Sequence, residues 1–476
     1  VARASAAVAR VAGEELRAQA GRVYGARLVL LVGPGTNGGD ALHAGALLAR
    51  RGAAVTALLT SGRVHAGGLA ALRRAGGRVV EDGAGAAGLA AVAAADVLLD
   101  GLLGIGGRPG LRAGAAALAA AARGSGARVV AVDVPSGADV TAGTLPGAGA
   151  GGDVPAVRAD VTVALGTAKP SLLVPPASAL AGRLVPAPIG LPADVLGTPV
   201  VERLETADLA ARWPRPGASS DKYSRGVLGV VAGGALYTGA AVLATGAAVR
   251  AGAGMVRYLG PGPATDLVRA RWPEVVPGDG RVQAWLLGPG VDPGDGAQAE
   301  HVEAALAQDV PCVVDAGALP ALVAALGEGR RGAGGTLVVP HAGELVRMLE
   351  ALGHGCSRAQ VEAAPLEHAR RAAEAAGVLV LLKGSTTLVV APGDEGRPVR
   401  AQADGTGWLA SAGSGDVLAG VVGALAAQGL DLLDAGSVGA AVHGLAGCAA
   451  SGGGPLHAEQ VLHAVPEVVA ALLPQP

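Results

Sequence analysis

The stretch RLVLLVGPGTNGGDALHAGALLAR, residues 27–50, decides the fold class of the first half of the chain. Arg27–Val32 is a short run rich in Leu and Val, which is typical of a strand buried on both faces. A glycine-rich loop follows at residues 33–40, and Ala41–Arg51 has the composition of a helix. A buried strand, a glycine loop and a helix in this order predict a parallel α/β sheet whose loop can approach a ligand closely.

The same alternation continues on both sides of a proline-rich stretch, Val185–Arg225. Proline ends regular structure, so we expect a domain boundary near residue 200. The predicted architecture is two three-layer α/β domains, residues 1–200 and 201–476. Further strands are expected at Ala54–Leu59, Arg78–Glu81, Val97–Leu99, Arg128–Val132, Asp160–Leu165, Val227–Val231, Met255–Tyr258, Ala284–Leu287, Val310–Val314, Thr336–Val338, Val378–Leu382 and Thr387–Val390.

Composition excludes several classes of function. The formal net charge is -2, so we expect no nucleic-acid partner. The sequence contains no run of about 18 apolar residues, so it predicts no membrane span. The three cysteines are far apart and lack metal-ligand spacing, which favours a reducing, cytoplasmic location. Val1–Arg22 is expected to be an amphipathic helix, with an Arg- and Ala-rich targeting segment as the alternative. Because the sequence starts at Val1, we expect the natural chain to begin further upstream.

The first glycine loop matches the G-x-G-x-x-G spacing of dinucleotide folds at Gly33, Gly35 and Gly38. Those folds carry an acidic residue about 20 positions on for the ribose hydroxyls, but residues 58–62 read LLTSG. The loop amides and the helix N-terminus behind them still favour a phosphate. Asn37 and Asp40 add polar chemistry that a tight turn without a ligand, the alternative, does not require.

Further polar residues stand at the ends of later strands. Asp100 ends one expected strand, and Asp133 and Ser136 follow the next. Parallel strands present their C-terminal ends at one edge of a sheet, so these side chains should converge with Asn37 and Asp40. Carboxylate, amide and hydroxyl oxygens suit a hard monovalent cation beside a phosphate-bearing ligand. The alternative is that each aspartate caps the helix that follows it.

Gly413-Ser414-Gly415-Asp416 is the most informative segment of the second half. It precedes an expected helix, Val417–Ala427, so its amides can cradle phosphate oxygens. Asp416 can take a proton from a substrate hydroxyl, which is phosphoryl-transfer architecture without a Walker sequence. His341 and Lys383 follow earlier strands in the order that would bring them to the same site. Complementing the helix dipole is the alternative role of Asp416.

Taken together, these motifs resemble the NAD(P)H-hydrate epimerase and dehydratase families, which occur fused. In the first half the matching segments are GPGTNGGD (33–40), DGLLGIG (100–106) and VDVPSG (132–137). In the second half they are YTGAA (237–241), LGPG (287–290), PHAGE (340–344), KG (383–384) and GSGDVLAG (413–420). The resemblance implies a Rossmann-like epimerase domain followed by a ribokinase-like, ADP-dependent dehydratase domain. Hydrated NADH and NADPH would be the substrates, and a homo-oligomer is expected.

The resemblance also implies the roles of individual residues. K⁺ would be bound by Asn37, Asp100 and Ser136. The epimerase pocket would comprise Thr36, Asn37, Gly38, Gly39, Asp40, Gly104, Ile105, Gly106, Gly107, Arg108, Pro109, Gly110 and the catalytic Asp133. The hydrate in the second domain would contact Ala240, Gly290, His341 and the catalytic Asp416. ADP, with Mg²⁺, would be held by Lys383, Gly384, Ser385, Thr386, Thr387, Gly413, Ser414 and Gly415.

Two other functions remain open from the sequence. The Gly-Ser-Gly-Asp anion hole also serves ribokinase-like vitamin or sugar kinases, which phosphorylate a stable alcohol. The first domain could also be a non-catalytic binding module, as in related mRNA-decapping and lipoprotein-binding proteins. The presence of Asp100, Asp133 and Ser136 favours the epimerase over this module.

Overall fold

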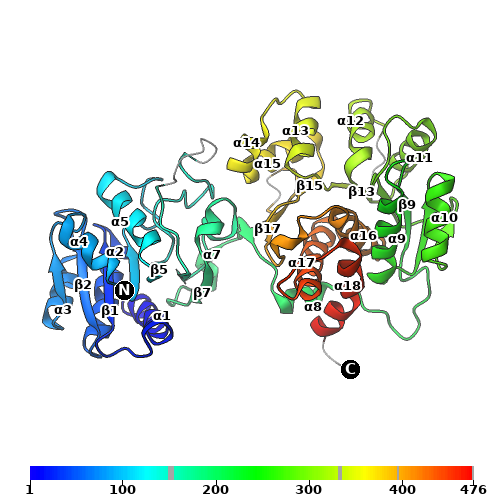
Figure 1. The fold of residues 1–476 in the computed structure, drawn as a ribbon. Coiled ribbons are helices and arrows are strands. Elements are labelled where there is room, and N and C mark those ends of the chain that lie inside the picture. Colours follow the sequence, from blue (N-terminus) through cyan, green and yellow to red (C-terminus); the bar gives the residue numbers. More distant parts are fainter. Residues whose placement is uncertain (148–154, 331–334, 394–395, 474–476) are drawn as a thin grey trace. The chain divides into compact units, whose positions relative to one another are not determined.

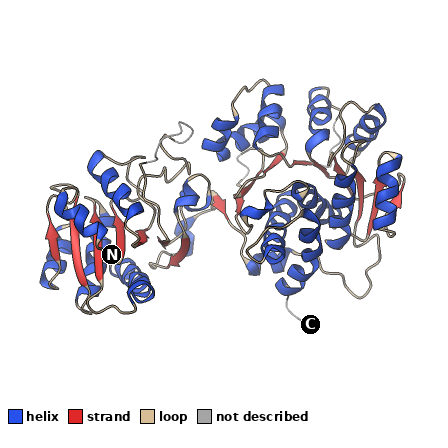
Figure 2. Cartoon of the chain, viewed as in Figure 1, coloured by secondary structure: helices blue, strands red, loops and turns tan. Residues whose placement is uncertain are grey.

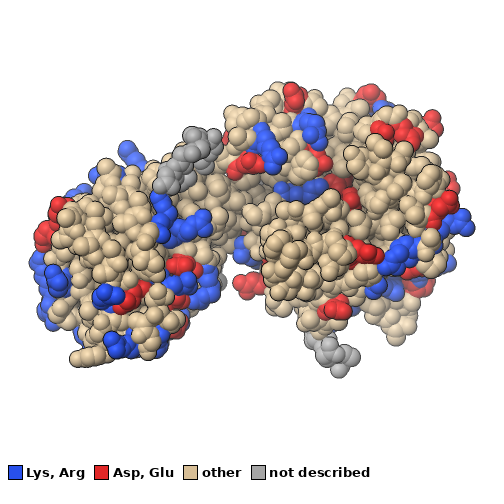
Figure 3. All heavy atoms as spheres, viewed as in Figure 1, with Lys and Arg blue, Asp and Glu red and all other residues tan. Residues whose placement is uncertain are grey.

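The computed structural model describes residues 1–147, 155–330, 335–393 and 396–473. Contacts divide the chain into two compact units, Val1–Pro199 with Glu362–Ala364, and Val200–Val361 with Pro365–Pro476. Each unit has one sheet with helices on both faces (Figures 1 and 2). The prediction of two α/β domains is therefore confirmed. Basic and acidic side chains are interspersed over the face drawn in Figure 3.

The first unit contains a seven-stranded sheet in the order β3-β2-β1-β4-β5-β6-β7, in which all neighbours are parallel. The chain runs from β1 outward to β3 and then returns to the other side of β1 as β4. The loops after β1 and β4 therefore leave the sheet in opposite directions, and ligands of open α/β sheets bind at such a point. The strands are β1 (Arg27–Val32), β2 (Ala54–Leu59), β3 (Arg78–Val80), β4 (Val97–Gly101), β5 (Arg128–Val132), β6 (Val161–Leu165) and β7 (Arg183–Ala187).

Alternate side chains of β1 enter two different cores. Leu28 and Leu30 are buried in a cluster with residues of α1 and α2, whereas Val29 and Leu31 are buried in a cluster with residues of α4 and α5. This burial on both faces explains the uninterrupted apolar run in the sequence. The helices of the unit are α1 (Ala2–Ala20), α2 (Thr36–Ala49), α3 (Ala66–Arg74), α4 (Ala86–Ala93), α5 (Ala113–Gly124), α6 (Pro170–Leu173), η1 (Ala177–Leu180) and α7 (Ala193–Leu196).

The second unit contains a ten-stranded sheet in the order β11-β10-β9-β12-β13-β14-β15-β16-β17-β8. Its neighbours are parallel except that β16 runs antiparallel to both β15 and β17. As between β1 and β4 of the first unit, the strand order reverses between β9 and β12: the chain runs outward from β9 to β11 and returns to the other side of β9 as β12. The strands are β8 (Val201–Glu202), β9 (Val227–Val231), β10 (Met255–Leu259), β11 (Val276–Pro277), β12 (Ala284–Leu287), β13 (Cys312–Val314), β14 (Thr336–Val338), β15 (Leu379–Leu382), β16 (Thr387–Val390) and β17 (Val399–Gln402).

Small residues let the helices of the second unit pack closely on its sheet. The helices α9, α16, α17 and α18 share one large core rich in Ala, Val and Leu. α17 is the one helix of the described residues that is long and apolar enough to cross a membrane, but 78% of its apolar window is buried in the unit. The helices are α8 (Thr206–Arg212), α9 (Thr238–Arg250), α10 (Gly262–Arg271), α11 (Gly296–Leu306), η2 (Ala316–Ala318), α12 (Leu319–Gly327), α13 (Ala342–Ala351), α14 (Arg358–Ala363), α15 (Pro365–Ala376), η3 (Gly407–Leu409), α16 (Ser414–Ala427), α17 (Leu432–Ser451) and α18 (Ala458–Leu472).

Several element boundaries differ from those predicted. α2 begins at Thr36 rather than Ala41, so Thr36–Asp40 is the first helical turn and not a loop. Glycine disfavours helix interiors, but close packing favours it here, because a Cβ atom at Gly38 would lie 2.2 Å from the Gly33 carbonyl oxygen and one at Gly39 would lie 2.8 Å from His65 Cγ. β4 extends to Gly101, which places Asp100 inside the strand.

The proline-rich stretch Val185–Arg225, for which no strand or helix was predicted, contains regular structure. β7 includes Pro186, and β8 and α8 also lie in the proline-rich stretch. β7 is an edge strand, where a missing backbone donor can face away from the sheet. β17 was not predicted, because the polar run Val399–Gln402 lacks a clear apolar pattern although all four residues are buried.

Candidate active sites

The end of β4 in the first unit holds a buried carboxylate that has no basic partner among the described residues. Asp100 is fully buried and accepts hydrogen bonds from the amide and hydroxyl of Ser136, at 2.8 and 2.7 Å, and from the Leu102 amide at 3.2 Å. Burial raises the pKa of Asp100 to about 6, although the Ser136 bonds oppose the rise. A buried carboxylate with neutral donors alone would be stabilised by a bound cation.

Asn37 joins this cluster from the first turn of α2. Its Nδ2 donates to the carbonyls of Val132, at 2.6 Å, and Leu103, at 3.3 Å. A Cβ atom at Gly104 would lie 2.3 Å from the Asn37 Oδ1 atom, so only glycine fits at that position. The expected convergence of Asn37, Asp100 and Ser136 is therefore present, and carbonyl oxygens surround it.

Asp133 lies just beyond β5 with a strained backbone. Its φ of 71° is in the left-handed region that non-glycine residues rarely adopt. Its side chain is 8% exposed, and Oδ1 accepts from the Leu165 amide at 2.9 Å and from Lys169 Nζ. Among the described residues no donor binds Oδ2, which leaves one oxygen of a fixed carboxylate for proton transfer.

The loop after β4 borders a cavity of about 730 Å³. Gly106, Arg108, Pro109 and Gly110 line it together with Pro34, while Ile105 is 66% exposed. Asp133 is not among its lining residues.

Other expected epimerase-site residues lie at or near the start of α2. Thr36 is exposed, and Gly38 and Gly39 are buried. Asp40 is directed elsewhere, because its Oδ1 accepts from Ser5 Oγ of α1 at 2.9 Å. Burial raises the pKa of Asp40.

The start of α16 in the second unit has the geometry of an anion cradle. Gly413 caps the helix with φ 86°, and Ser414, Gly415 and Asp416 form its first turn. A Cβ atom at Gly413 would lie 2.6 Å from Leu243 Cδ1, so the Leu243 side chain would have to move, and the left-handed conformation itself favours glycine. The Ser414 amide donates to the Ser411 carbonyl at 3.4 Å, whereas among the described residues the amides of Gly415 and Asp416 have no helical carbonyl to bind and are available to phosphate oxygens.

A charged cluster faces this helix start. Lys383 Nζ donates to Asp315 Oδ1 at 2.8 Å and lies 3.7 Å from Glu344 Oε2. Burial alone would lower the pKa of Lys383, but the charges of Asp315 and Glu344 outweigh it and the pKa is raised. Burial, followed by the negative charge of Asp315, raises the pKa of Asp416 to about 7. Lys383 therefore remains an ammonium ion, whereas Asp416 can exchange a proton near neutral pH.

His341 is held at the N-terminus of α13 by a capping box. Its Nδ1 accepts from the Glu344 amide at 3.2 Å, and Glu344 Oε2 accepts from the His341 amide at 2.9 Å. The main chain of Lys383 donates to the Pro340 carbonyl at 2.8 Å, which brings His341 and Lys383 into adjacent strand ends. The imidazole remains 56% exposed.

A cavity of about 630 Å³ opens beside Lys383 and the α16 cradle. The sequence-predicted residues that line it are His341, Lys383, Gly384, Ser385, Thr387, Ser414 and Gly415. Thr386 and Ala240 are buried, and neither they nor Gly290, Gly413 and Asp416 are lining residues. Gly290 and Ala240 do lie together where the strand order reverses, since a Cβ atom on Gly290 would be 2.6 Å from Ala240 Cβ.

Sequence reasoning missed three residues of these sites. Asp315 follows β13 and Lys169 follows β6, so the rule that strand ends carry functional groups could have identified both. His443 also lines the cavity, and its Nε2 lies 3.2 Å from Ser414 Oγ. Burial lowers the pKa of His443 to about 4, so the ring is neutral. No sequence spacing connects His443 with Ser414, since they are on different helices.

Comparison with known proteins finds relatives of both halves of the chain. Residues 1–171 match the family described as YjeF-related protein N-terminus, and residues 228–459 match NAD(P)H-hydrate dehydratase. The bifunctional NAD(P)H-hydrate repair enzyme Nnr of Mycobacterium tuberculosis is 44% identical, over 90% of this chain and 84% of its own length. The Nnr of Mycobacterium leprae is 43% identical, over 91% of this chain and 85% of its own.

A solved structure resembles part of the chain. It is the ADP/ATP-dependent NAD(P)H-hydrate dehydratase of Bacillus subtilis, with 23% identity and a TM-score of 0.49, covering 56% of this chain and 97% of its own. The extent of identity to the mycobacterial proteins, together with the two family matches in the same order, establishes the relationship. This chain belongs to the family of bifunctional NAD(P)H-hydrate repair enzymes.

Proposed function

We propose that this protein repairs hydrated NADH and NADPH in two steps. The first unit interconverts the R and S hydrates, and the second dehydrates the S form with consumption of ADP. The observation that carries the proposal is the start of α16, where glycine amides, Lys383 and a proton-exchanging Asp416 meet beside a cavity. Family membership supports the same activity.

The chemistry of the second unit follows from this geometry. Asp416 accepts the proton of the hydrate hydroxyl while that oxygen attacks the terminal phosphoryl group of ADP, and AMP leaves. Lys383 and the amides of Gly415 and Asp416 stabilise the charge on the transferred group. The ring nitrogen then expels phosphate, and loss of a ring proton gives NAD(P)H.

The first unit is proposed to act through Asp133. The hydrate is a carbinolamine, so its ring nitrogen can expel the hydroxyl to form an iminium ion, which water can attack from either face. Asp133 gives a proton to the departing hydroxyl and takes one from the incoming water. Lys169 positions the carboxylate by engaging Oδ1, which keeps the other oxygen directed to the reacting hydroxyl.

Two metal ions fit the residues present. We propose K⁺ at the cluster of Asn37, Asp100 and Ser136, because in the described part of the chain the buried Asp100 carboxylate is bound by neutral donors alone. When bound, K⁺ supplies a positive charge that orients a phosphorylated ligand. The described residues contain no group of three or more His, Cys, Asp or Glu placed to hold a metal. Mg²⁺ would therefore be held mainly by nucleotide phosphates and water, and it would supply charge neutralisation.

The test uses the purified chain with acid-generated NADH hydrate and ADP. Recovery of absorbance at the reduced-nicotinamide band, with one AMP and one phosphate per NADH, is the expected result. Asp416→Asn should abolish it while epimer exchange, followed by NMR, continues. A kinase would instead release a stable phosphorylated alcohol, which the same product analysis detects. Absence of recovery with the intact chain overturns the proposal.

We also propose a cytoplasmic location. Among the described residues no disulfide joins Cys312, Cys356 or Cys448, which suits a reducing compartment. The homo-oligomeric state stays a prediction.

A further inference from the structure

The cavity beside α16 contains one carboxylate that the proposed chemistry does not use. Asp404 follows β17 and lines the cavity together with Gln402, Gly405 and Thr406. Gln402 Nε2 donates to Asp404 Oδ2 at 3.1 Å. Gln402 is the one side-chain donor to the Asp404 carboxylate among the described residues; the backbone amide of Asp404 also donates to it, and the positive charge of Arg203 lies nearby. Two carboxylate oxygens have more acceptor positions than these donors fill, so the group can still accept from a ligand.

Two successive residues of α17 place Asp404 next to the phosphate cradle. His443 contacts Ser414 in the cradle, with 3.2 Å between Nε2 and Oγ. A Cβ atom at Gly444 would lie 2.8 Å from the Gly405 amide nitrogen and 2.9 Å from the Asp404 carbonyl carbon. The segment that carries Asp404 therefore lies one helix residue away from the cradle. In a nucleotide, the group joined directly to the phosphates is the ribose.

The chemistry of a carboxylate selects the ribose over the other parts of a nucleotide. A carboxylate repels phosphates but accepts hydrogen bonds from two neighbouring hydroxyls, as the acidic residue of dinucleotide folds does. We propose that Asp404 recognises the ribose hydroxyls of the adenine nucleotide and thereby selects ribonucleotides. This inference rests on the proposed function, because it needs ADP in this cavity.

Gln402 acts as the positioning residue for Asp404. It is 3% exposed, its Oε1 accepts from the Leu204 amide at 2.8 Å, and its Nε2 donates to the Leu204 carbonyl at 3.2 Å. The side-chain amide is thus fixed in one orientation, with its remaining donor directed to Asp404. Leu204 follows β8, so the first strand of the second unit defines the orientation of this wall.

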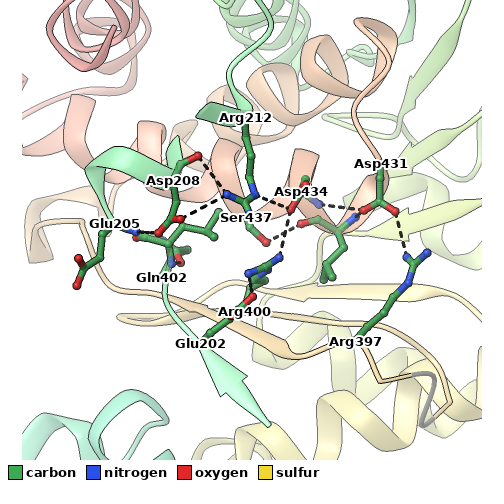
Figure 4. Close-up of polar contacts among 12 residues, drawn as sticks. Glu202, Glu205, Asp208, Arg212, Arg397, Arg400, Gln402, Asp431, Asp434 and Ser437 are labelled. Carbon is green, nitrogen blue, oxygen red and sulfur yellow. Dashed lines mark hydrogen bonds and ion pairs between the residues drawn. The ribbon is translucent and has the colours of Figure 1, made fainter. Parts of the chain in front are cut away.

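An ion network holds β8 in that place (Figure 4). Arg400 of β17 pairs with Glu202 of β8 and lies 3.4 Å from Asp434 of α17. Arg212 of α8 joins the same Asp434 at 3.3 Å. Figure 4 shows Gln402 beside this network. Because β8, β17 and α17 are tied together, Gln402 and Asp404 keep their positions when the cavity is empty.

The experiment compares the binding of ADP, 2′-deoxy-ADP and 3′-deoxy-ADP to the full chain by calorimetric titration. Hydrogen bonds to a charged acceptor are expected to make ADP bind about tenfold or more tightly than at least one deoxy analogue. In Asp404→Ala this ratio should fall to about one, because the acceptor is gone. Asp266→Asn, an exposed acid on α10, should keep the wild-type ratio.

A structural role alone would weaken all three ligands equally and leave the ratio unchanged, and that result overturns the inference. Equal wild-type affinity for ADP and both analogues also overturns it. If Asp404→Ala does not fold, Asp404→Asn keeps the shape and should still reduce the ratio. Gln402→Leu should reduce it as well, through loss of positioning. Failure of the wild type to bind ADP at all would instead refute the proposed function.

Discussion

Replacing Asp416 by Asn should abolish dehydration and stabilise the second unit. The raised pKa of Asp416 means that the folded protein binds this proton more tightly than the unfolded chain does. The contribution of protonated Asp416 to the free energy of unfolding is therefore full below pH 3.8 and is lost as the pH rises from 3.8 to about 7. A pKa of about 7 in place of 3.8 corresponds to a cost of at most about 4 kcal/mol above neutral pH.

Asparagine has no charge to bury, so Asp416→Asn should escape this cost. Near pH 8 the variant should be more stable than the wild type by up to about 4 kcal/mol, and near pH 4 the two should be about equal. Loss of the base should lower the dehydration rate by about a hundredfold or more. In the wild type, kcat/KM should rise about tenfold between pH 6 and pH 8, since it follows the ionised fraction of Asp416.

Urea unfolding followed by tryptophan fluorescence measures the second unit selectively. All four tryptophans lie in it, and Trp213, Trp272 and Trp285 are buried. Glu300→Gln, an exposed change on α11, is the matched control and should alter neither stability nor rate. A variant that loses stability at pH 8, or a rate that stays flat across neutral pH, would refute the reasoning about Asp416.

Three further outcomes concern the other groups of the two sites. In calorimetry, KCl should raise the melting temperature of the first unit relative to choline chloride. The difference should grow as the pH rises through about 6, because Asp100 ionises there. Asp100→Asn should show no such difference. Lys169→Met should slow epimer exchange, measured by NMR, by about a hundredfold, because it frees the Asp133 carboxylate to rotate. Lys169→Arg should retain part of the rate. An unchanged exchange rate in Lys169→Met contradicts the positioning role. Gly413→Val should raise the Kd for ADP at least about tenfold, since its side chain would collide with Leu243, and unchanged titration curves would show that the cradle does not bind phosphate.

The local sequence alone predicted most of the strands in their observed order, but it missed β7, β8, β11 and β17. The run Arg27–Val32 is apolar because both faces of β1 are buried, and that signal is readable from the chain itself. Glycine at 413 and 104 indicated close approach before any contact was known. The sequence also indicated Asp416 as a residue of the first helical turn, since the motif and the helix pattern are contiguous.

Tertiary structure alone decided the environment of each acid, because pKa and orientation depend on neighbours distant in the sequence. Asp133 and Lys169 meet only when β5 and β6 pair, and Asp315 reaches Lys383 only because β13, β14 and β15 are adjacent. Asp40 contacts Ser5 only because α1 packs against α2. Burial and pairing are properties of the assembled sheet, so the spacing of residues along the chain does not determine which carboxylates hold protons.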